Sequence, residues 1–181
     1  QLIRSYTVVV KSLSIGNLVW QDLDQDGVKD AGESGIDGVT LRLYQTSNTT
    51  IGDGDDVLRQ TTTSSGGGAY SFSGVDAGMY YVKINTPPSG VTFSSGPQVN
   101  ADNGTDNDNN GVQAGGNNTS VVSPVITLTG GTEPGSSGST NIEDTIDFAF
   151  RAVTTPGPNL LEFDMNVTSG GLPVPPSLKN S

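Results

Sequence analysis

Apolar and polar residues alternate in several short runs along the chain, which is the spacing of β-strands that bury one face. The runs at residues 15–20 and 39–44 read I-G-N-L-V-W and V-T-L-R-L-Y, and their β-branched and aromatic side chains favour strands. No stretch predicts a helix of normal length, so we expect an all-β domain. Further runs of the same kind lie at residues 57–63, 69–73, 79–84, 121–129 and 145–153.

The apolar residues at alternate positions of these runs are the expected core. Pro124 has no backbone N–H to donate, so the run that contains it should lie at a sheet edge or begin at the proline. Trp20, beside the first acidic stretch, is expected to be a core anchor. The predicted core consists of Trp20, Val39, Leu41, Leu43, Tyr70, Phe72, Tyr80, Val82, Ile146, Phe148 and Phe150.

Residues 22–33 read D-L-D-Q-D-G-V-K-D-A-G-E, which places acidic side chains and a central glycine at the spacing of a twelve-residue calcium loop. Calcium takes about six to eight oxygen ligands, and a tight loop can direct alternate residues at one centre. The flanking runs predict strands rather than the helices of an EF-hand, so we expect a structural clamp and not a sensor. The expected ligands are Asp22, Asp24, Asp26, the carbonyl of Val28, Asp30 and Glu33. The alternative is a solvated acidic turn.

Two more acidic segments are candidate cation sites. Residues 51–56 carry Asp53, Asp55 and Asp56, which would hold a second ion or form an exposed hairpin tip. Residues 99–112 form a polar loop dense in oxygen donors, and calcium ligation and a flexible loop are its two interpretations. Its candidate ligands are Asp102, Asp106, Asp108 and Asn110.

Charge and amino-acid composition argue against several classes of partner and of catalytic chemistry. The formal net charge is -11, with 8 Lys plus Arg against 19 Asp plus Glu, which argues against nucleic acid and anionic membranes as partners. The sequence has no cysteine and no histidine, which removes thiolate chemistry and the usual general base. No apolar run is long enough to span a membrane. The chain begins at Gln1 without a leader, so we expect a mature secreted form.

Strand-like segments flank the central domain, at residues 5–13 and 160–167. Such apolar strands must pair with their own sheet or with a neighbouring molecule. We therefore divide the chain into an N-terminal extension (1–14), a β-sandwich domain (15–153) and a C-terminal tail (154–181). The residues expected to contact a neighbouring subunit are Tyr6, Val8, Val10, Leu160, Leu161, Phe163, Met165 and Val167.

Residues 15–152 resemble one B-type domain of the serine-aspartate-repeat adhesins and related bacterial surface proteins. The pieces that carry the resemblance are I-G-N-L-V-W-Q-D-L-D-Q-D-G-V-K-D-A-G-E, G-A-Y-S-F-S-G-V-D-A-G-M-Y-Y-V, D-N-D-N-N-G-V-Q, V-I-T-L-T-G-G-T-E-P and I-D-F-A-F, in the order that the family has them. The resemblance implies an immunoglobulin-like β-sandwich that calcium makes rigid and that serves as a spacer or stalk. It also implies calcium ligation by the acidic residues of the 22–33 loop and by the Asp102 to Asn110 loop.

We expect a calcium-rigidified structural subunit of a secreted filament or surface layer, assembled from copies of itself head to tail by strand donation. If both extensions instead fold onto their own sandwich, this assembly route is lost. The alternative function is a monomeric spacer that acts as a cell-surface adhesin or ligand-binding module with an extracellular ligand. We do not expect an enzyme, because the acidic pairs are better explained as metal ligands than as a catalytic pair.

Overall fold

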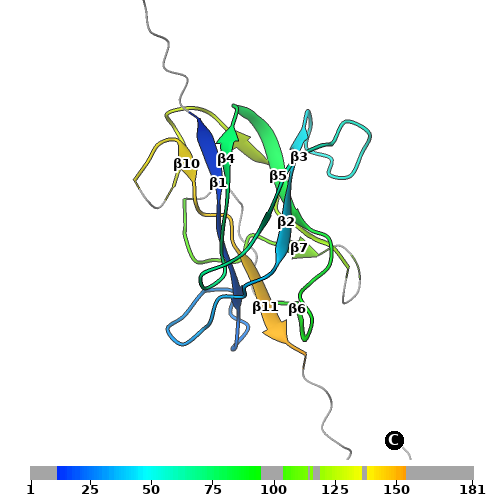
Figure 1. The fold of residues 1–181 in the computed structure, drawn as a ribbon, viewed down its shortest axis with the longest axis vertical. Helices are drawn as coiled ribbons and strands as arrows, with labels where there is room; N and C mark the ends of the chain where they lie inside the picture. Colours follow the sequence, from blue (N-terminus) through cyan, green and yellow to red (C-terminus); the bar gives the residue numbers. More distant parts are fainter. Residues whose placement is uncertain (1–11, 95–103, 114, 116–118, 136–137, 154–181) are drawn as a thin grey trace, which may run out of the picture.

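Two β-sheets pack face to face in a computed structural model of the protein, which describes residues 12–94, 104–113, 115, 119–135 and 138–153 (Figure 1). All regular elements in these ranges are strands, so the all-β prediction is confirmed, and the arrangement is that of an immunoglobulin-like sandwich. The described ranges hold no helix that is long and apolar enough to cross a membrane. Asp102 and all eight predicted subunit-contact residues lie outside the described residues.

The first sheet is built around the long strand β1. Strand β4 pairs with one edge of β1 in antiparallel orientation, while β10 and β11 pair in parallel with successive parts of the other edge. Strand β6 then pairs with β11. The bounds of these strands are β1 Leu13–Gln21, β4 Ala69–Val75, β6 Val91–Phe93, β10 Ile142–Glu143 and β11 Phe148–Ala152.

The second sheet runs in the order β3, β2, β5, β8 and β7, and β9 also pairs with β5. All its pairings are antiparallel, and the β2–β3 hairpin carries the acidic tip at residues 51–56. The bounds are β2 Thr40–Thr46, β3 Val57–Thr63, β5 Gly78–Ile84, β7 Val112–Gln113, β8 Val121–Val122 and β9 Ile126–Leu128.

The apolar core lies between the two sheets, and every residue of the predicted core is buried. This result follows from the strand period of two residues, which turns each alternate apolar side chain inward. Leu13 is also buried in the core, as the first residue of β1. The first strand of the sandwich therefore begins inside the segment assigned to the N-terminal extension.

The run at residues 121–129 forms two short strands instead of one. Both pair with β5, and the break between them contains Ser123 and Pro124. The proline has no N–H for the ladder, and the hydroxyl of Ser123 accepts a hydrogen bond from the Val82 amide at 2.9 Å. The amide of Ser123 donates to the Val82 carbonyl, also at 2.9 Å. The two bonds with Ser123 keep Val82 of β5 hydrogen-bonded at the break between β8 and β9.

The two ends of the described domain lie at opposite ends of its long axis (Figure 1). Strand β1 begins at one end, and β11, which runs parallel to it, finishes at the other. A chain that passes through this domain therefore enters and leaves it at opposite poles.

Candidate metal centre

The acidic loop at residues 22–33 begins where β1 ends, at the pole where β11 also ends (Figure 1). Its two ends are fixed to the sheet: the amide of Asp22 donates to the Phe150 carbonyl at 2.7 Å, and the amide of Gln21 donates to the Ser34 carbonyl at 2.9 Å. Inside the loop, Gln25 and Gly27 have positive φ angles of 66° and 78°. The predicted sharp turn at the sixth loop position is thus present, and glycine is the residue that takes it without strain.

Two carboxylates of the loop are buried and held by protein donors. Asp22 accepts hydrogen bonds from the amides of Gln25 at 2.6 Å and Gly27 at 3.2 Å, and from the Ser94 hydroxyl at 2.5 Å. Glu33 accepts bonds from the amide of Leu23 at 2.6 Å, the amide of Asp30 at 3.0 Å and the indole of Trp20 at 3.1 Å. These donors fix both carboxylates in position. Trp20 is buried beside the loop, as predicted, but it lies outside the main core cluster, which contains its neighbour Val19.

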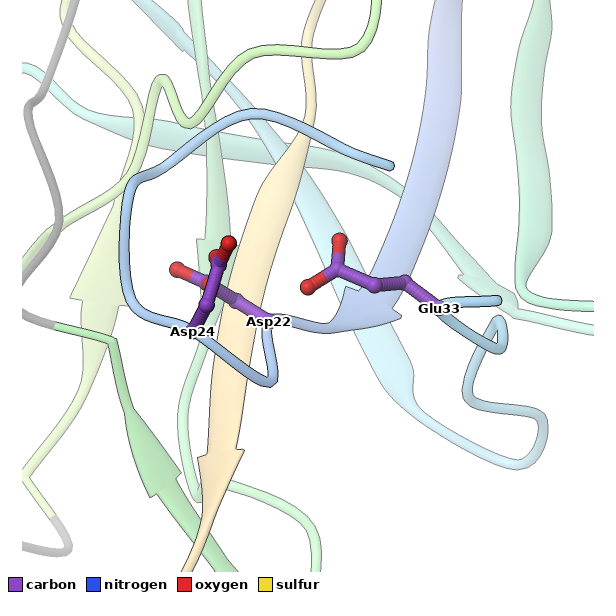
Figure 2. A group of neighbouring side chains, drawn as sticks. All are labelled: Asp22, Asp24 and Glu33. Atoms are coloured by element: carbon purple, nitrogen blue, oxygen red, sulfur yellow. The ribbon is translucent and has the colours of Figure 1, made fainter. Parts of the chain in front are cut away.

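The loop carboxylates gather into two groups that share Asp24. One group contains Asp22, Asp24 and Glu33, and Figure 2 shows the Glu33 carboxylate extending toward the other two. The other contains Asp24, Asp26 and Asp30. In each group, one oxygen per residue lies within 4.8 Å of the others. The structure therefore brings together all five acidic side chains that the loop spacing selected, while ligation by the Val28 carbonyl stays a prediction.

The loop at residues 104–111 lies against the 22–33 loop. The amide of Lys29 donates to the Asn107 carbonyl at 2.8 Å, and the amide of Asn109 donates to the Gly27 carbonyl at 2.9 Å. Val28 and Asp108 form an antiparallel bridge between these bonds. The two oxygen-rich loops are therefore one unit, joined through their backbones.

The predicted ligands of the 104–111 loop make contacts within the protein. Asp106 accepts a hydrogen bond from the Asn17 side chain at 2.6 Å, and Asp108 accepts one from the Asn110 amide group at 3.2 Å. The Asn110 side-chain oxygen accepts the backbone amide of Asp147 at 2.7 Å. Among the described acidic side chains, Asp106 and Asp108 do not join a group of three, and their calcium ligation stays a prediction.

Asp147 is a buried acid that is not among the predicted metal ligands. Its carboxylate accepts hydrogen bonds from the amides of Leu18 at 2.8 Å and Asn107 at 2.9 Å, so it ties β1 to the 104–111 loop. Burial away from water raises its pKa well above the ordinary value, despite these two donors, and the charge of Asp106 adds to the rise. In the sequence it lies between two predicted core residues, Ile146 and Phe148, so a regular strand would turn its side chain outward. The loop covers that face, which no local pattern indicates.

At the acidic hairpin tip, nearby side chains donate hydrogen bonds to the aspartates. Asp55 accepts hydrogen bonds from Ser47 and Asn48, and Asp56 accepts one from the Tyr81 hydroxyl at 2.9 Å. Hydrogen bonding with Asp53, followed by that with Ser47, lowers the pKa of Asp55 to about 2. The three aspartates form a further group with oxygens within 4.8 Å, and a second ion at this tip stays a prediction.

The donor set of the 22–33 loop fits a hard divalent cation. Its side-chain donors are carboxylate oxygens, and like charges at such distances repel one another unless a cation lies between them. Lys29 is the one basic residue within residues 22–33. Asp22, Asp24, Asp26, Asp30 and Glu33 are the residues that could hold the ion.

Fold and site together define a class: an immunoglobulin-like β-sandwich with an acidic loop at one pole. The sequence pattern of the SdrD B-like domain matches residues 13–150. The chain belongs to this family, which confirms the resemblance seen in the sequence. The family is one of structural adhesin domains and not of enzymes, and it assigns the chain to the cell surface.

Individual relatives cover only part of the chain. Serine-aspartate repeat-containing protein D of Staphylococcus aureus (strain Newman) is 36% identical over 103 residues, which are 57% of this chain and 7% of that protein. Serine-aspartate repeat-containing protein F of Staphylococcus epidermidis is 36% identical over 74 residues, 41% of this chain and 4% of that protein. Colossin-B of Dictyostelium discoideum is 28% identical over 95 residues, 52% of this chain and 2% of that protein. The chain thus spans a small fraction of the length of these relatives.

Proposed function

We propose that the protein is a structural module of an extracellular filament or surface layer and that calcium makes it rigid. The observation that carries the proposal is the convergence of five carboxylates in a loop bonded to β1, β11 and the 104–111 loop. An ion held there neutralises the carboxylates and links the segments that meet at this pole. The role is mechanical, because the flanking strands leave no helix pair to open.

Asp24 is the residue to test, because it belongs to both carboxylate groups and is exposed. The substitution Asp24→Asn removes one charge from each group without cutting a core contact. We expect it to weaken calcium binding at least about tenfold, or about 1.4 kcal/mol, in isothermal titration calorimetry, because it removes one negative charge from both carboxylate groups. Asp76→Asn makes the same chemical change at an exposed site outside the carboxylate groups and should leave binding unchanged. Equal affinity of both variants would count against the site.

We propose head-to-tail assembly of copies by strand donation as the way in which these modules join. The opposite positions of the two chain ends support it, because consecutive modules then extend along one axis (Figure 1). The second sheet supplies an acceptor in β3, an edge strand of seven residues whose Val57 and Leu58 are exposed. Among the described strands, β3 pairs with β2 alone, and a free edge of this length is a template for a further strand. Residues 5–11 and 160–167 are the two candidate donors, because Leu13 already belongs to β1 and to the core.

Two deletions test this assembly by electron microscopy of the assembled protein. The N-terminal deletion removes residues 1–11 only, because Leu13 is part of the core. The C-terminal deletion removes residues 154–181. We expect one of them to abolish filaments while circular dichroism and the melting temperature show a folded domain. Filaments that survive both deletions would exclude donation by these segments.

The second candidate function is a monomeric spacer within a larger cell-surface protein, with or without an adhesive ligand. Two observations support it: the chain ends lie at opposite poles of the domain (Figure 1), and the relatives are much longer than this chain. Size-exclusion chromatography with light scattering separates the candidates. A monomer at all concentrations, with calcium present, would favour the spacer over the self-assembling subunit.

A further inference from the structure

Two cationic side chains lie opposite each other on the outer face of the second sheet. Arg42 of β2 is in register with Lys83 of β5, and the residues on either side of Arg42, Leu41 and Leu43, point into the core. Neither cation makes a side-chain hydrogen bond or an ion pair within the described part of the chain. The sequence has only 8 basic residues against 19 acidic ones, so a cation pair without an acidic partner is unexpected.

Like charges directly opposite each other on neighbouring strands are unfavourable. Elsewhere on the same sheet, Arg59 is engaged, because its guanidinium donates to the side-chain oxygen of Gln45. Among the described residues, no side chain forms an ion pair or hydrogen bond with Arg42 or Lys83 that would offset their repulsion. An anion placed between the two side chains would remove the repulsion and gain two charge-assisted hydrogen bonds.

A cavity of about 360 Å³ opens beside Arg42, and Lys83 lies outside its lining. The residues that line it include Arg42, the polar residues Thr40, Asn85 and Thr86, and two prolines, Pro87 and Pro88. The side chains of Thr40, Asn85 and Thr86 make no hydrogen bond within the part of the chain that the structure describes. The cavity therefore presents one cation, several free hydroxyl and amide groups and a small apolar wall, in the size range of small-ligand sites.

An aromatic surface adjoins the cation pair. Tyr44 is the next outward-facing residue of β2 after Arg42, and its ring stacks on Tyr81 with centroids 5.1 Å apart and planes 5° apart. Tyr44 keeps part of its surface exposed. A rigid ring of this kind is a platform for the apolar face of a ligand whose other edges are polar.

We propose that this face binds a carboxylate-bearing saccharide, such as a uronic acid unit of an acidic polysaccharide. The planar guanidinium of Arg42 matches a carboxylate with two parallel hydrogen bonds, and Lys83 adds a second positive charge. Sugar hydroxyls pair with Thr40, Asn85 and Thr86, groups that a simple inorganic anion does not need. The strongly acidic remainder of the chain repels a polyanion, which confines its binding to this patch.

The test is a nuclear magnetic resonance titration of the whole chain at constant ionic strength with calcium in excess. The probes are glucuronate, glucose, acetate and inorganic phosphate. We expect glucuronate to bind most tightly and to shift the amide signals of residues 38–42 and 83–86. Arg42→Gln should weaken glucuronate binding about tenfold or more, while Arg59→Gln, with the same charge change on the edge of the same sheet, should leave it unchanged.

Three outcomes would overturn the proposal. Phosphate or acetate that binds as tightly as glucuronate would show that no saccharide is recognised. Glucuronate shifts confined to residues 22–33 would mean that the sugar acid binds at the calcium loop. Equal loss of affinity in Arg42→Gln and Arg59→Gln would reduce the effect to net charge. Because calcium is saturating throughout, a negative result leaves the proposed structural role of the metal unaffected.

Discussion

The substitution Asp147→Asn tests the connection between β1 and the 104–111 loop. Asp147 is fully buried, and each of its two carboxylate oxygens accepts one backbone amide, from Leu18 and from Asn107. The asparagine side chain keeps one acceptor and turns an NH₂ group toward the second amide. A buried amide without an acceptor costs about 1–3 kcal/mol. For a chain of this size, about 2–4 °C of melting temperature correspond to each kcal/mol, so we expect a decrease of about 2–12 °C.

The assay is thermal and urea unfolding with calcium in excess, so that metal loss does not contribute. Asp76→Asn is the matched control at an exposed position and should change the stability by less than about 0.5 kcal/mol. Hydrogen exchange adds a local measurement, because the amide that loses its acceptor should exchange faster. The reasoning is refuted if Asp147→Asn is as stable as the parent protein, or if Asp76→Asn loses as much stability.

Two further substitutions probe the fold away from the metal loop. Tyr70 is buried, its hydroxyl donates to the Ile146 carbonyl at 2.6 Å, and burial, followed by the charge of Asp147, raises its pKa well above 10. A raised phenol pKa gives stability that is complete below the unfolded-state pKa of about 10 and is lost as the pH rises toward the folded-state pKa. Tyr70→Phe should therefore cost about 0.5–1.5 kcal/mol at pH 7 and make the dependence of stability on alkaline pH less steep. An unchanged pH dependence would contradict this. A Cβ on Gly35 would lie 1.7 Å from the Gly67 carbonyl oxygen, so Gly35→Ala should destabilise the domain by at least about 1–3 kcal/mol in urea unfolding. Gly54→Ala, which meets open space, is its control and should be neutral or slightly stabilising; similar losses in both would mean that the close approach at Gly35 is not limiting.

The strands and the core were predictable because the pattern that encodes them is local. Alternation places Leu41, Leu43 and Phe72 inward whatever the rest of the chain does, and all three are buried. The 22–33 loop was predictable for the same reason, since its five acidic residues are close in sequence. The break at Pro124 was foreseen only as an edge or a strand start, because the chain does not reveal that Ser123 completes the pairing with β5.

The remaining parts of the site depend on contacts between distant segments. Ser94 donates to Asp22 across 72 positions of sequence, and Asn17 donates to Asp106 across 89. No spacing rule links such pairs. Asp147 was missed because the strand pattern predicts an exposed side chain there, whereas the 104–111 loop covers it. A polar residue that alternates with core residues in a closing strand can therefore be an anchor for a loop that packs on its outer side.

The most direct test of calcium as the rigidifying ligand is the melting temperature of the intact chain in calcium, in excess EDTA and after calcium is restored. Ligand at about 100 times its dissociation constant stabilises a protein by about 2.7 kcal/mol, which here corresponds to about 5–11 °C. We predict a decrease of this size in EDTA, full recovery with calcium and weaker recovery with magnesium, which prefers a smaller octahedral site. An unchanged melting temperature in EDTA, with no metal found by elemental analysis of the purified protein, would contradict the account.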